Sequence, residues 1–280
     1  MKIEAYAKVN FTLEVFPERE DGYHSLRSLV VPISLSDTLD ITLRDDAEIH
    51  TDSPYKDDLA LKAALALRAS RFVQSESPGV NIKIEKRIPA GGGLGGGSAD
   101  AAATLIALNE LWALNLPREA LAELATTIGS DVPSLVMGNS VIMEGRGEKV
   151  TPFGDFPQLS LVLLNPGIFS STKQVYQKCT PRVTNDPKIL YNIRQAVQGG
   201  SLSDIANALM NDLQEPAIAL HPEIASSMDL LRSLGVEKPL MTGSGSTVFG
   251  LVSNEDEGRK IANLLTSKGH KAWFVKSVVR

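Results

Sequence analysis

A run of glycines in the first half of the chain constrains the fold more than any other feature. Six of the seven residues from Gly91 to Gly97 are glycine, and a helical pattern begins directly after them at Ser98. Glycine lets the backbone approach a ligand closely, but ordering each residue costs about 1–2 kcal/mol of backbone entropy. Free N–H groups and the positive end of a helix dipole face such a loop, which suits it to phosphate. The structural alternative is a flexible or tightly packed connector.

Several known phosphate loops are excluded by the residues on the C-terminal side of the glycines. No Gly-Lys-Ser/Thr occurs there, so the run is not a Walker A loop. Gly91-x-Gly93-x-x-Gly96 matches the dinucleotide fingerprint, but the density of glycines makes that match nearly automatic. A dinucleotide fold next needs a strand that ends in an acidic residue, whereas a second helix is predicted at 117–128. Protein-kinase HRD and DFG motifs are absent. The run therefore indicates a phosphate loop of another architecture.

Composition narrows the class of protein. With 280 residues, 43% hydrophobic and 22% charged, the chain is typical of a soluble globular protein of one or two domains. A net charge of −5 argues against a nucleic-acid partner. The single cysteine, Cys179, excludes an intramolecular disulfide and a zinc site built from several thiolates. Neither the charged first residues nor the proline-containing run Phe156–Thr172 resembles a targeting or membrane segment. We therefore expect a cytoplasmic protein without a membrane partner.

The N-terminal segment gives the clearest strand signal. Apolar residues alternate with polar ones from Ile3 to Val15, which predicts a strand with one buried and one polar face. Lys8, Asn10 and Thr12 share the polar face. Because strands in purely parallel sheets are apolar throughout, this alternation favours an antiparallel or mixed sheet.

The remaining pattern interleaves strands and helices without a regular βαβ repeat, which predicts an α+β fold. Asp21-Gly22 predicts a turn, 140–153 a hairpin, and 166–187 an irregular stretch. Strands are expected at 26–35, 40–43, 80–88, 159–164, 247–252 and 272–279. Helices are expected at 57–72, 98–112, 117–128, 201–213, 222–234 and 255–268, with a short one through Met137 capped by Ser130. The pattern resets near 154–157, which predicts domains at 1–155 and 156–280.

Three motifs together resemble those of the GHMP small-molecule kinases. They are Ala7-Lys8-Val9-Asn10, Thr242-Gly243-Ser244-Gly245-Ser246, and the series Pro89, Ala90, Gly91, Gly92, Gly93, Leu94, Gly95, Gly96, Gly97, Ser98 and Ala99. Asp21-Gly22-Tyr23-His24-Ser25-Leu26 and Gly129-Ser130-Asp131-Val132-Pro133 resemble motifs of one subfamily in particular. Its members phosphorylate the 2-hydroxyl of 4-diphosphocytidyl-2-C-methyl-D-erythritol, in non-mevalonate isoprenoid precursor synthesis. The resemblance extends from residue 1 to about 252, with the motifs in the expected order.

The resemblance implies a two-lobed α+β fold. An N-terminal, nucleotide-binding lobe would combine a mixed sheet with helices, and a C-terminal lobe would form an α/β sandwich. The active site would lie in the cleft between them. ATP and Mg²⁺ are the implied cofactors, with residues 89–99 binding the nucleotide. Isolated histidines without metal-ligand spacing give no protein metal site.

Two residues carry the chemistry that the resemblance implies. Lys8 would lie near the acceptor hydroxyl and the transferred phosphoryl group, where its charge is stabilising. Asp131 would take the proton from the hydroxyl. Local sequence allows simpler roles, namely a solvated lysine and a helix-capping or dipole-stabilised carboxylate. Ser98 is predicted to cap its helix and to offer its hydroxyl to phosphate or magnesium. Asp100 lies in the first turn, where the dipole favours an acid, and is not assigned to a metal.

Substrate-binding residues are also transferred from the resemblance. Tyr23 and His24 would hold the cytosine by stacking and hydrogen bonding, with Tyr176 as the second stacking partner. Asn10, Thr172, Gly243 and Ser244 complete this set. Without the resemblance, Tyr23 and His24 would be interpreted as packing residues beside a turn.

Two departures and three rival functions complete the sequence-based picture. Asp58 stands where the subfamily commonly has asparagine, which removes amide donors from a possible nucleotide contact. The segment 181–200 matches no pattern.

The rivals are a sister kinase acting on mevalonate, homoserine or a sugar, a non-catalytic nucleotide-binding regulator, and a dinucleotide-binding dehydrogenase. The Tyr23-His24 pair argues against the sister kinase, because its substrates contain no base. The presence of both Lys8 and Asp131 argues against a regulator, which needs neither. The predicted helix at 117–128 argues against the dehydrogenase, which needs a strand there.

Overall fold

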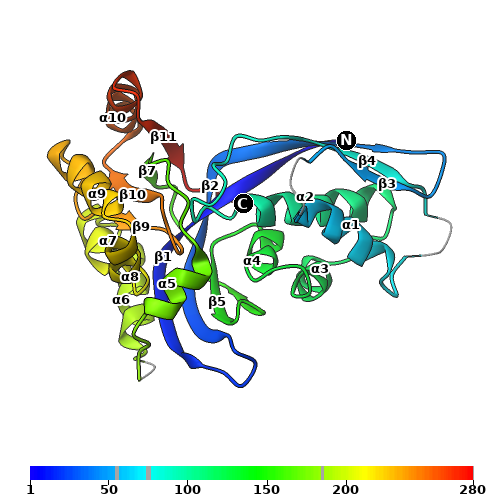
Figure 1. Ribbon diagram of the computed structural model, residues 1–280, viewed down its shortest axis with the longest axis horizontal. Coiled ribbons are helices and arrows are strands. Elements are labelled where there is room, and N and C mark those ends of the chain that lie inside the picture. Colours follow the sequence, from blue (N-terminus) through cyan, green and yellow to red (C-terminus); the bar gives the residue numbers. More distant parts are fainter. Residues whose placement is uncertain (54–56, 74–76, 184–185, 280) are drawn as a thin grey trace. The chain divides into compact units, whose positions relative to one another are not determined.

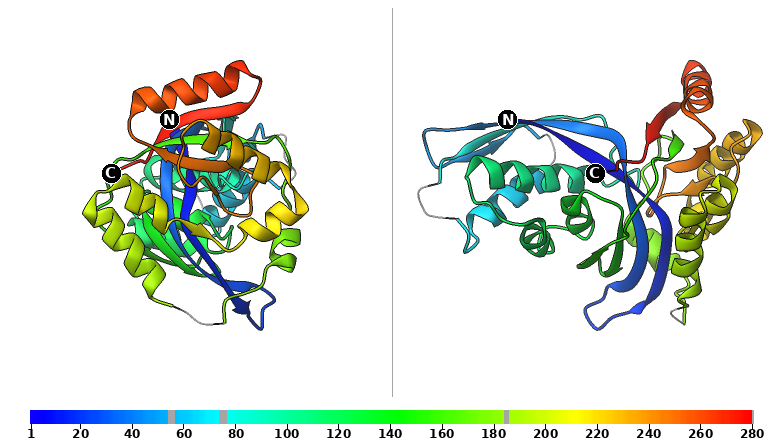
Figure 2. Two further views of the ribbon diagram at one scale, coloured as in Figure 1. Left: turned by 90° about the vertical axis from the view of Figure 1, so that its left-hand side faces the viewer. Right: turned by 180° about the vertical axis from the view of Figure 1, so that it is seen from behind.

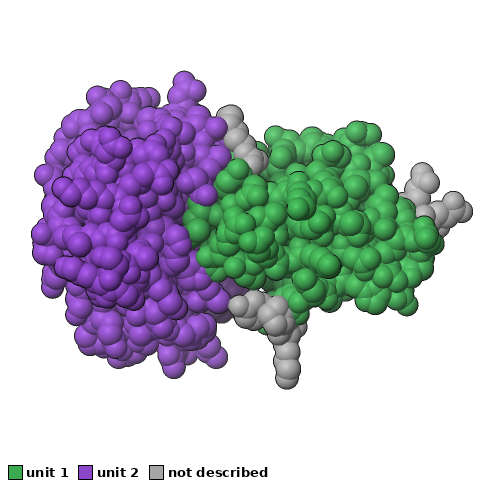
Figure 3. Space-filling view, turned by 90° about the horizontal axis from the view of Figure 1, so that it is seen from above, with its two compact units in different colours: residues 1–7, 35–88, 95–138 green, residues 8–34, 89–94, 139–280 purple. Residues whose placement is uncertain are grey.

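The computed structural model describes residues 1–53, 57–73, 77–183 and 186–279. The chain divides into two compact units made of separate segments (Figure 3). Unit 1 comprises residues 1–7, 35–88 and 95–138, and unit 2 comprises residues 8–34, 89–94 and 139–280. Two long strands, β1 (Lys2–Glu18) and β2 (His24–Leu43), contribute residues to both units (Figure 1). The domain boundary predicted near residue 155 stays a prediction.

Strand β1 confirms the predicted alternating segment, but its polar face is not solvated. Lys8, Asn10 and Thr12 are all buried within unit 2. Strand β2 replaces the two strands predicted at 26–35 and 40–43. Ser36 and Asp37 interrupt the apolar pattern there, which suggested a break from sequence. Both are instead buried and hydrogen-bonded inside unit 1, so the strand continues through them.

In unit 1, helices cover a mixed sheet. The end of β2 pairs antiparallel with β4 (Val80–Glu85), which pairs parallel with β3 (Ile49–Thr51). The helices are α1 (Leu59–Arg68), α2 (Gly96–Leu111), α3 (Arg118–Ala125) and α4 (Val132–Met137). Helix α2 is buried on most sides, and its alanines let α1 pack closely alongside (Figures 1 and 2).

In unit 2, the predicted hairpin is present as β5 (Val141–Gly145) and β6 (Lys149–Pro152), with β5 also pairing with β2. A two-residue strand, β8 (Met210–Asn211), pairs parallel with β1. A second, antiparallel sheet has the order β11 (Lys271–Lys276), β7 (Ser160–Asn165), β10 (Val248–Val252) and β9 (Leu240–Met241). Phe11 of β1 stacks on Phe249 of β10, with ring centroids 5.7 Å apart, and joins the two sheets through an aromatic core.

The described residues of unit 2 contain six further helices. They are α5 (Thr172–Lys178), α6 (Lys188–Gly199), α7 (Leu202–Ala208), α8 (Gln214–Leu220), α9 (Glu223–Ser233) and α10 (Glu255–Ser267). Helix α10 lies along β11, as Figure 2 shows, and α7 and α9 pack against β10. Across the four described ranges of the chain, no helix is both long and apolar enough to cross a membrane.

Three local predictions need correction. The predicted helix at 201–213 ends at Ala208, because the residues after it pair with β1 as β8. Helix α8 then begins as a separate element. The stretch 166–187, predicted to be irregular, contains α5, and α6 occupies much of the segment 181–200 that matched no pattern.

Candidate functional site

The first half of the glycine run packs against a turn in unit 2. Gly93 has a φ of +75°, and a Cβ atom there would lie 2.2 Å from the carbonyl oxygen of Thr242. A Cβ on Gly92 would lie 2.7 Å from Oγ1 of Thr247, whose backbone N–H donates to the Gly92 carbonyl at 3.1 Å. These glycines therefore meet a packing requirement, as the connector alternative proposed, in addition to any approach to phosphate.

The second half of the run starts helix α2 in unit 1. Gly95 is the N-cap residue with a φ of +71°, and no side chain caps the helix. The helix begins at Gly96, two residues before the predicted start, so Ser98 lies within the first turn and does not cap it. The first N–H groups of a helix lack intrahelical partners, and the dipole adds positive potential at this end. This geometry is suited to an anion.

A charge cluster of two buried carboxyl groups and a partly buried lysine lies beside this helix start and was not predicted. Lys86 Nζ donates to Asp37 Oδ2 at 2.5 Å and to Asp100 Oδ2 at 2.6 Å. Asp37 Oδ1 also accepts the backbone N–H groups of Arg87 and Ile88 at 2.5 and 2.8 Å. A Cβ on Gly96 would lie 3.6 Å from Lys86 Nζ, so the ammonium stands beside the first turn of α2.

Electrostatics within this cluster are unbalanced, because two carboxylates share one ammonium. Burial raises the pKa of Asp100 to about 7, against the opposing charge of Lys86. Burial alone would lower the pKa of Lys86, but Asp100 and Asp37 outweigh it, and the pKa is raised. The sequence did contain a signal for these residues: Lys86 and Asp37 each occupy the buried phase of an alternating strand pattern.

Lys8 starts a buried chain of polar groups in unit 2. Its Nζ donates to Asn10 Oδ1 at 2.8 Å, and Asn10 Nδ2 donates to Ser28 Oγ at 2.8 Å. The N–H of Asn10 donates to Thr242 Oγ1 at 3.0 Å. Lys8 is only 3% exposed, so the solvated-lysine alternative is wrong. Burying an ammonium is costly, and such groups are often functional.

Gly243 is placed next to this lysine. A Cβ at Gly243 would lie 3.3 Å from Lys8 Nζ, and the residue has a φ of +57°. Asn211 Nδ2 donates to the carbonyl oxygens of Met241 and Gly243 at 2.7 and 2.8 Å, which fixes the turn. The predicted residues Lys8, Asn10 and Gly243 are thus brought together.

Asp131 lies in unit 1, at the N-cap position of α4 that was predicted for Ser130. Its side chain makes no capping hydrogen bond, so capping is not its role. Asp58, the departure from the subfamily, does cap its helix: Oδ1 accepts the N–H of Ala60 at 2.9 Å. Within the described ranges, the buried Oδ2 of Asp58 has no hydrogen-bond partner.

The predicted base-binding residues also lie in unit 2. The rings of His24 and Tyr176 are in contact, with centroids 5.6 Å apart, and His24 Nδ1 lies 2.8 Å from the carbonyl oxygen of Phe16. Tyr23 is 56% exposed, and the guanidinium of Arg146 lies 4.7 Å from the centre of its ring. The His24 and Tyr176 rings are therefore brought together, and rings of this kind are suited to stacking on a planar heterocycle, whereas Tyr23 lies in the same unit with its ring against Arg146.

A hydroxyl pair connects this region to the turn at 242–247. Thr172 Oγ1 and Ser244 Oγ are 2.8 Å apart, and Ser170 Oγ donates to the Ser244 carbonyl at 2.7 Å. All seven predicted substrate-binding residues therefore belong to unit 2, and contacts within the unit connect most of them.

Together, the fold, the glycine loop before α2 and the turn that packs on it define a class of small-molecule kinase. The model for the N-terminal domain of GHMP kinases matches residues 58–139, and that for their C-terminal domain matches residues 192–271. The chain belongs to the GHMP kinases, a family of ATP-using small-molecule kinases.

Its relatives make the assignment more specific. A protein of Brevibacillus brevis named 4-diphosphocytidyl-2-C-methyl-D-erythritol kinase is 38% identical, over 99% of this chain and 94% of its own length. A crystal structure of 4-(cytidine 5'-diphospho)-2C-methyl-D-erythritol kinase superposes with a TM-score of 0.85 at 35% identity, covering all of both chains. The L. major mevalonate kinase structure, at 19% identity and a TM-score of 0.70 over 99% of this chain and 95% of its own, shares the fold.

Proposed function

We propose that this kinase transfers the γ-phosphoryl group of ATP to the 2-hydroxyl of 4-diphosphocytidyl-2-C-methyl-D-erythritol, in the non-mevalonate route to isoprenoid precursors. Relatives that bear this substrate in their names, such as the one at 38% identity over nearly the whole chain, support the proposal. The observation that carries it is the His24–Tyr176 contact in the same unit as Lys8 and Asn10. Mevalonate, homoserine and sugars contain no base that requires such a pair.

His24 supplies the selectivity for cytosine in this proposal. A carbonyl oxygen only accepts hydrogen bonds, so His24 Nδ1 donates to Phe16 and Nε2 of the neutral ring is an acceptor. Cytosine presents a 4-amino donor where uracil presents a carbonyl acceptor. Nε2 therefore accepts from the cytosine amino group, and Tyr23 and Tyr176 stack on the base.

Lys8 and Asp131 perform the transfer in this proposal. The ammonium of Lys8 stabilises charge that develops on the acceptor oxygen and the phosphoryl group. Asp131, the N-cap residue of α4, removes the hydroxyl proton. Holding this base in position supplies much of its effect, as is usual in phosphoryl transfer.

Residues 89–99 hold the nucleotide, with the start of α2 facing its phosphates. Among the described residues, no group of three histidine, cysteine or acidic side chains could hold a metal ion. In this proposal Mg²⁺ would be held by phosphate oxygens and water, with the Ser98 hydroxyl offered to phosphate or to the ion. When bound, the ion neutralises charge on the phosphates.

The use of ATP and the single thiol, Cys179, fit a cytoplasmic enzyme.

The test is ADP release by the purified protein with ATP, Mg²⁺ and 4-diphosphocytidyl-2-C-methyl-D-erythritol. Mevalonate, homoserine, galactose and the uridine analogue of the substrate are run in parallel. We expect rapid release with the cytidyl substrate and a large loss with the uridine analogue. Release with another acceptor alone would keep the kinase and overturn the substrate. ATP binding without release for any acceptor would favour the regulator.

A further inference from the structure

A buried ion pair lies close to the point where His24 contacts strand β1. The His24 ring reaches the carbonyl oxygen of Phe16 on β1. Two residues earlier, Glu14 forms a bidentate pair with Arg27 of β2 at 2.7 and 2.9 Å, and both side chains are buried. The guanidinium of Arg27 also lies 5.9 Å from the centre of the Phe16 ring. The backbone that holds His24 is therefore fixed by a buried, paired charge.

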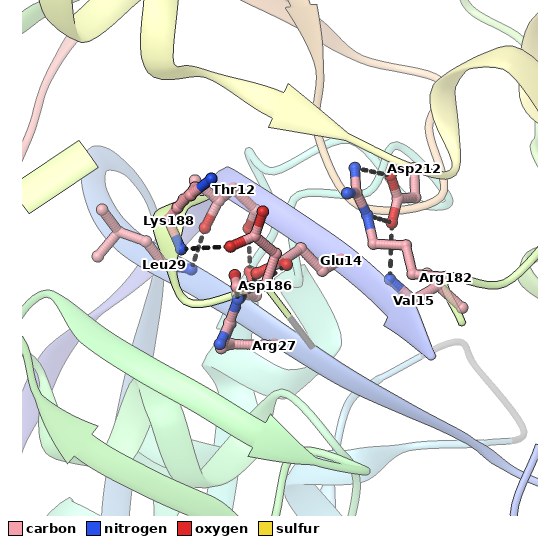
Figure 4. Close-up of polar contacts among 10 residues, drawn as sticks. Thr12, Glu14, Val15, Arg27, Leu29, Arg182, Asp186, Lys188 and Asp212 are labelled. Carbon is pink, nitrogen blue, oxygen red and sulfur yellow. Dashed lines mark hydrogen bonds and ion pairs between the residues drawn. The ribbon is translucent and has the colours of Figure 1, made fainter. Parts of the chain in front are cut away.

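The same stretch of β1 holds the chain on the C-terminal side of α5. The N–H of Arg182 donates to the Val15 carbonyl at 2.7 Å, and the Arg182 guanidinium donates to both oxygens of Asp212 at 2.5 and 2.7 Å (Figure 4). Asp212 in turn accepts the N–H of Val15 at 2.9 Å and donates its own N–H to the Leu13 carbonyl at 2.9 Å. Figure 4 shows Arg27 of the neighbouring pair reaching the Asp186 carbonyl as well, at 2.5 Å.

This attachment is close to Tyr176. The N–H of Cys179 donates to the Tyr176 carbonyl at 3.1 Å at the end of α5, and Cys179 Sγ lies 3.8 Å from the carbonyl oxygen of Asp212. Arg182 stands three residues later in the chain. The Arg182–Asp212 pair therefore fixes the C-terminal end of the helix that carries Tyr176.

The neighbour of Asp212 fixes the other end of α5. Asn211 holds the turn at 242–247 through two carbonyl oxygens, and Ser244 of that turn bonds Thr172 at the first position of α5. Two consecutive residues, Asn211 and Asp212, thus connect both ends of α5 to the strand that also holds His24.

From these contacts we infer that Arg182 and Asp212 are positioning residues for recognition of the cytidine group. They hold Tyr176 at the correct distance from His24 without themselves contacting the base. The inference rests on the proposed function, because it concerns the same base-binding pair. A role confined to stability predicts that the pair affects ATP and the cytidyl substrate alike. A positioning role predicts a selective effect.

The test is steady-state kinetics of Asp212→Asn, which keeps the size of the side chain but removes the charge that binds Arg182. We expect the KM for the cytidyl substrate to rise about tenfold or more, as displaced binding groups do, with kcat and the KM for ATP within about twofold. Arg182→Lys keeps the charge and loses the bidentate geometry, and should fall between wild type and Asp212→Asn. Asp229→Asn breaks the exposed Arg232–Asp229 pair on α9 and is the matched control.

Binding of cytidine 5'-diphosphate and of ATP, measured by calorimetry, separates the possible outcomes. Weaker binding of cytidine diphosphate alone, by the same factor as the KM, supports the inference. Equal losses for both nucleotides, or no loss for either, would overturn it. If Asp212→Asn does not fold, Arg182→Lys provides the same comparison. Failure of the proposed function would be recognised separately, as a wild-type protein that binds cytidine diphosphate but does not phosphorylate the cytidyl substrate.

Discussion

Asp100→Asn is expected to make stability less sensitive to pH. The Asp100 side chain is 7% exposed and accepts one hydrogen bond, from Lys86. Within the described ranges, its Oδ1 atom has no hydrogen-bond partner. Asp37, by contrast, accepts three hydrogen bonds and is fully buried. Of the two carboxyl groups that share Lys86, Asp100 is therefore the one with fewer hydrogen bonds to compensate its burial.

The magnitude comes from the pKa of Asp100, which burial raises from 3.8 to about 7. The folded state binds the proton of the Asp100 carboxyl group more tightly than the unfolded state does. The contribution of this proton to the free energy of unfolding is therefore fully present below about pH 4. It is lost as the pH rises through 7, and the whole loss corresponds to about 4 kcal/mol. Asparagine does not titrate. The stability of the variant relative to wild type should therefore increase by about 4 kcal/mol between pH 4 and pH 8.

The assay is urea unfolding of both proteins at half-unit steps across this pH range. Other carboxyl groups titrate in both proteins, so their effects cancel in the difference. Asp57→Asn is the control, since Asp57 is exposed and its hydrogen bond from Lys62 lowers its pKa, which gives a pH dependence of opposite sign. A difference between Asp100→Asn and wild type that stays constant with pH would refute the reasoning, because it would mean that Lys86 keeps Asp100 ionised throughout.

Three further predictions concern activity and packing. Asp131→Asn should keep ATP affinity and lose turnover by about 10²–10⁴-fold in the ADP-release assay, and near-full activity would disprove its role as base. Gly93→Ala places a Cβ atom 2.2 Å from a carbonyl oxygen at positive φ, so urea unfolding should show a loss above about 2 kcal/mol, whereas Gly199→Ala, with open space around it, should be tolerated. Arg27→Met should cost about 3–5 kcal/mol by leaving Glu14 buried and unpaired, and adding Glu14→Met should recover most of this; equal stability of both variants would contradict it.

Local patterns predicted the elements whose signals lie within a few residues. The hairpin at 140–153, the start of α3 after Pro117 and the turn at Gly22 are confirmed. The end of α7 was not predictable in this way. Its cause is β8, which exists because Met210 and Asn211 pair with β1, about 200 residues away in sequence. The helical propensity of the residues after Ala208 carries no information about a distant strand with which they can pair.

Burial of the polar face of β1 was also beyond local sequence. Alternation shows which residues share a face but does not show what covers that face. Asn10 is covered by Thr242, which is 232 residues away. The roles of Lys8 and Asp131 came from motif resemblance, and the structure adds that one is buried and the other does not cap its helix.

The glycine run has two separate causes, and this affects how its variants can be interpreted. Gly92 and Gly93 have no space for a Cβ atom next to the turn at 242–247, so alanine there disrupts packing whether or not phosphate binds. Gly97 differs, since a Cβ atom there would make only an ordinary contact with Leu59, at 3.6 Å, and the residue is exposed in the first turn of α2. Loss of activity in alanine variants of Gly92 or Gly93 therefore does not test phosphate binding. In Gly97→Ala, by contrast, weaker ATP binding with an unchanged free energy of unfolding would indicate that the new methyl group disturbs the nucleotide itself.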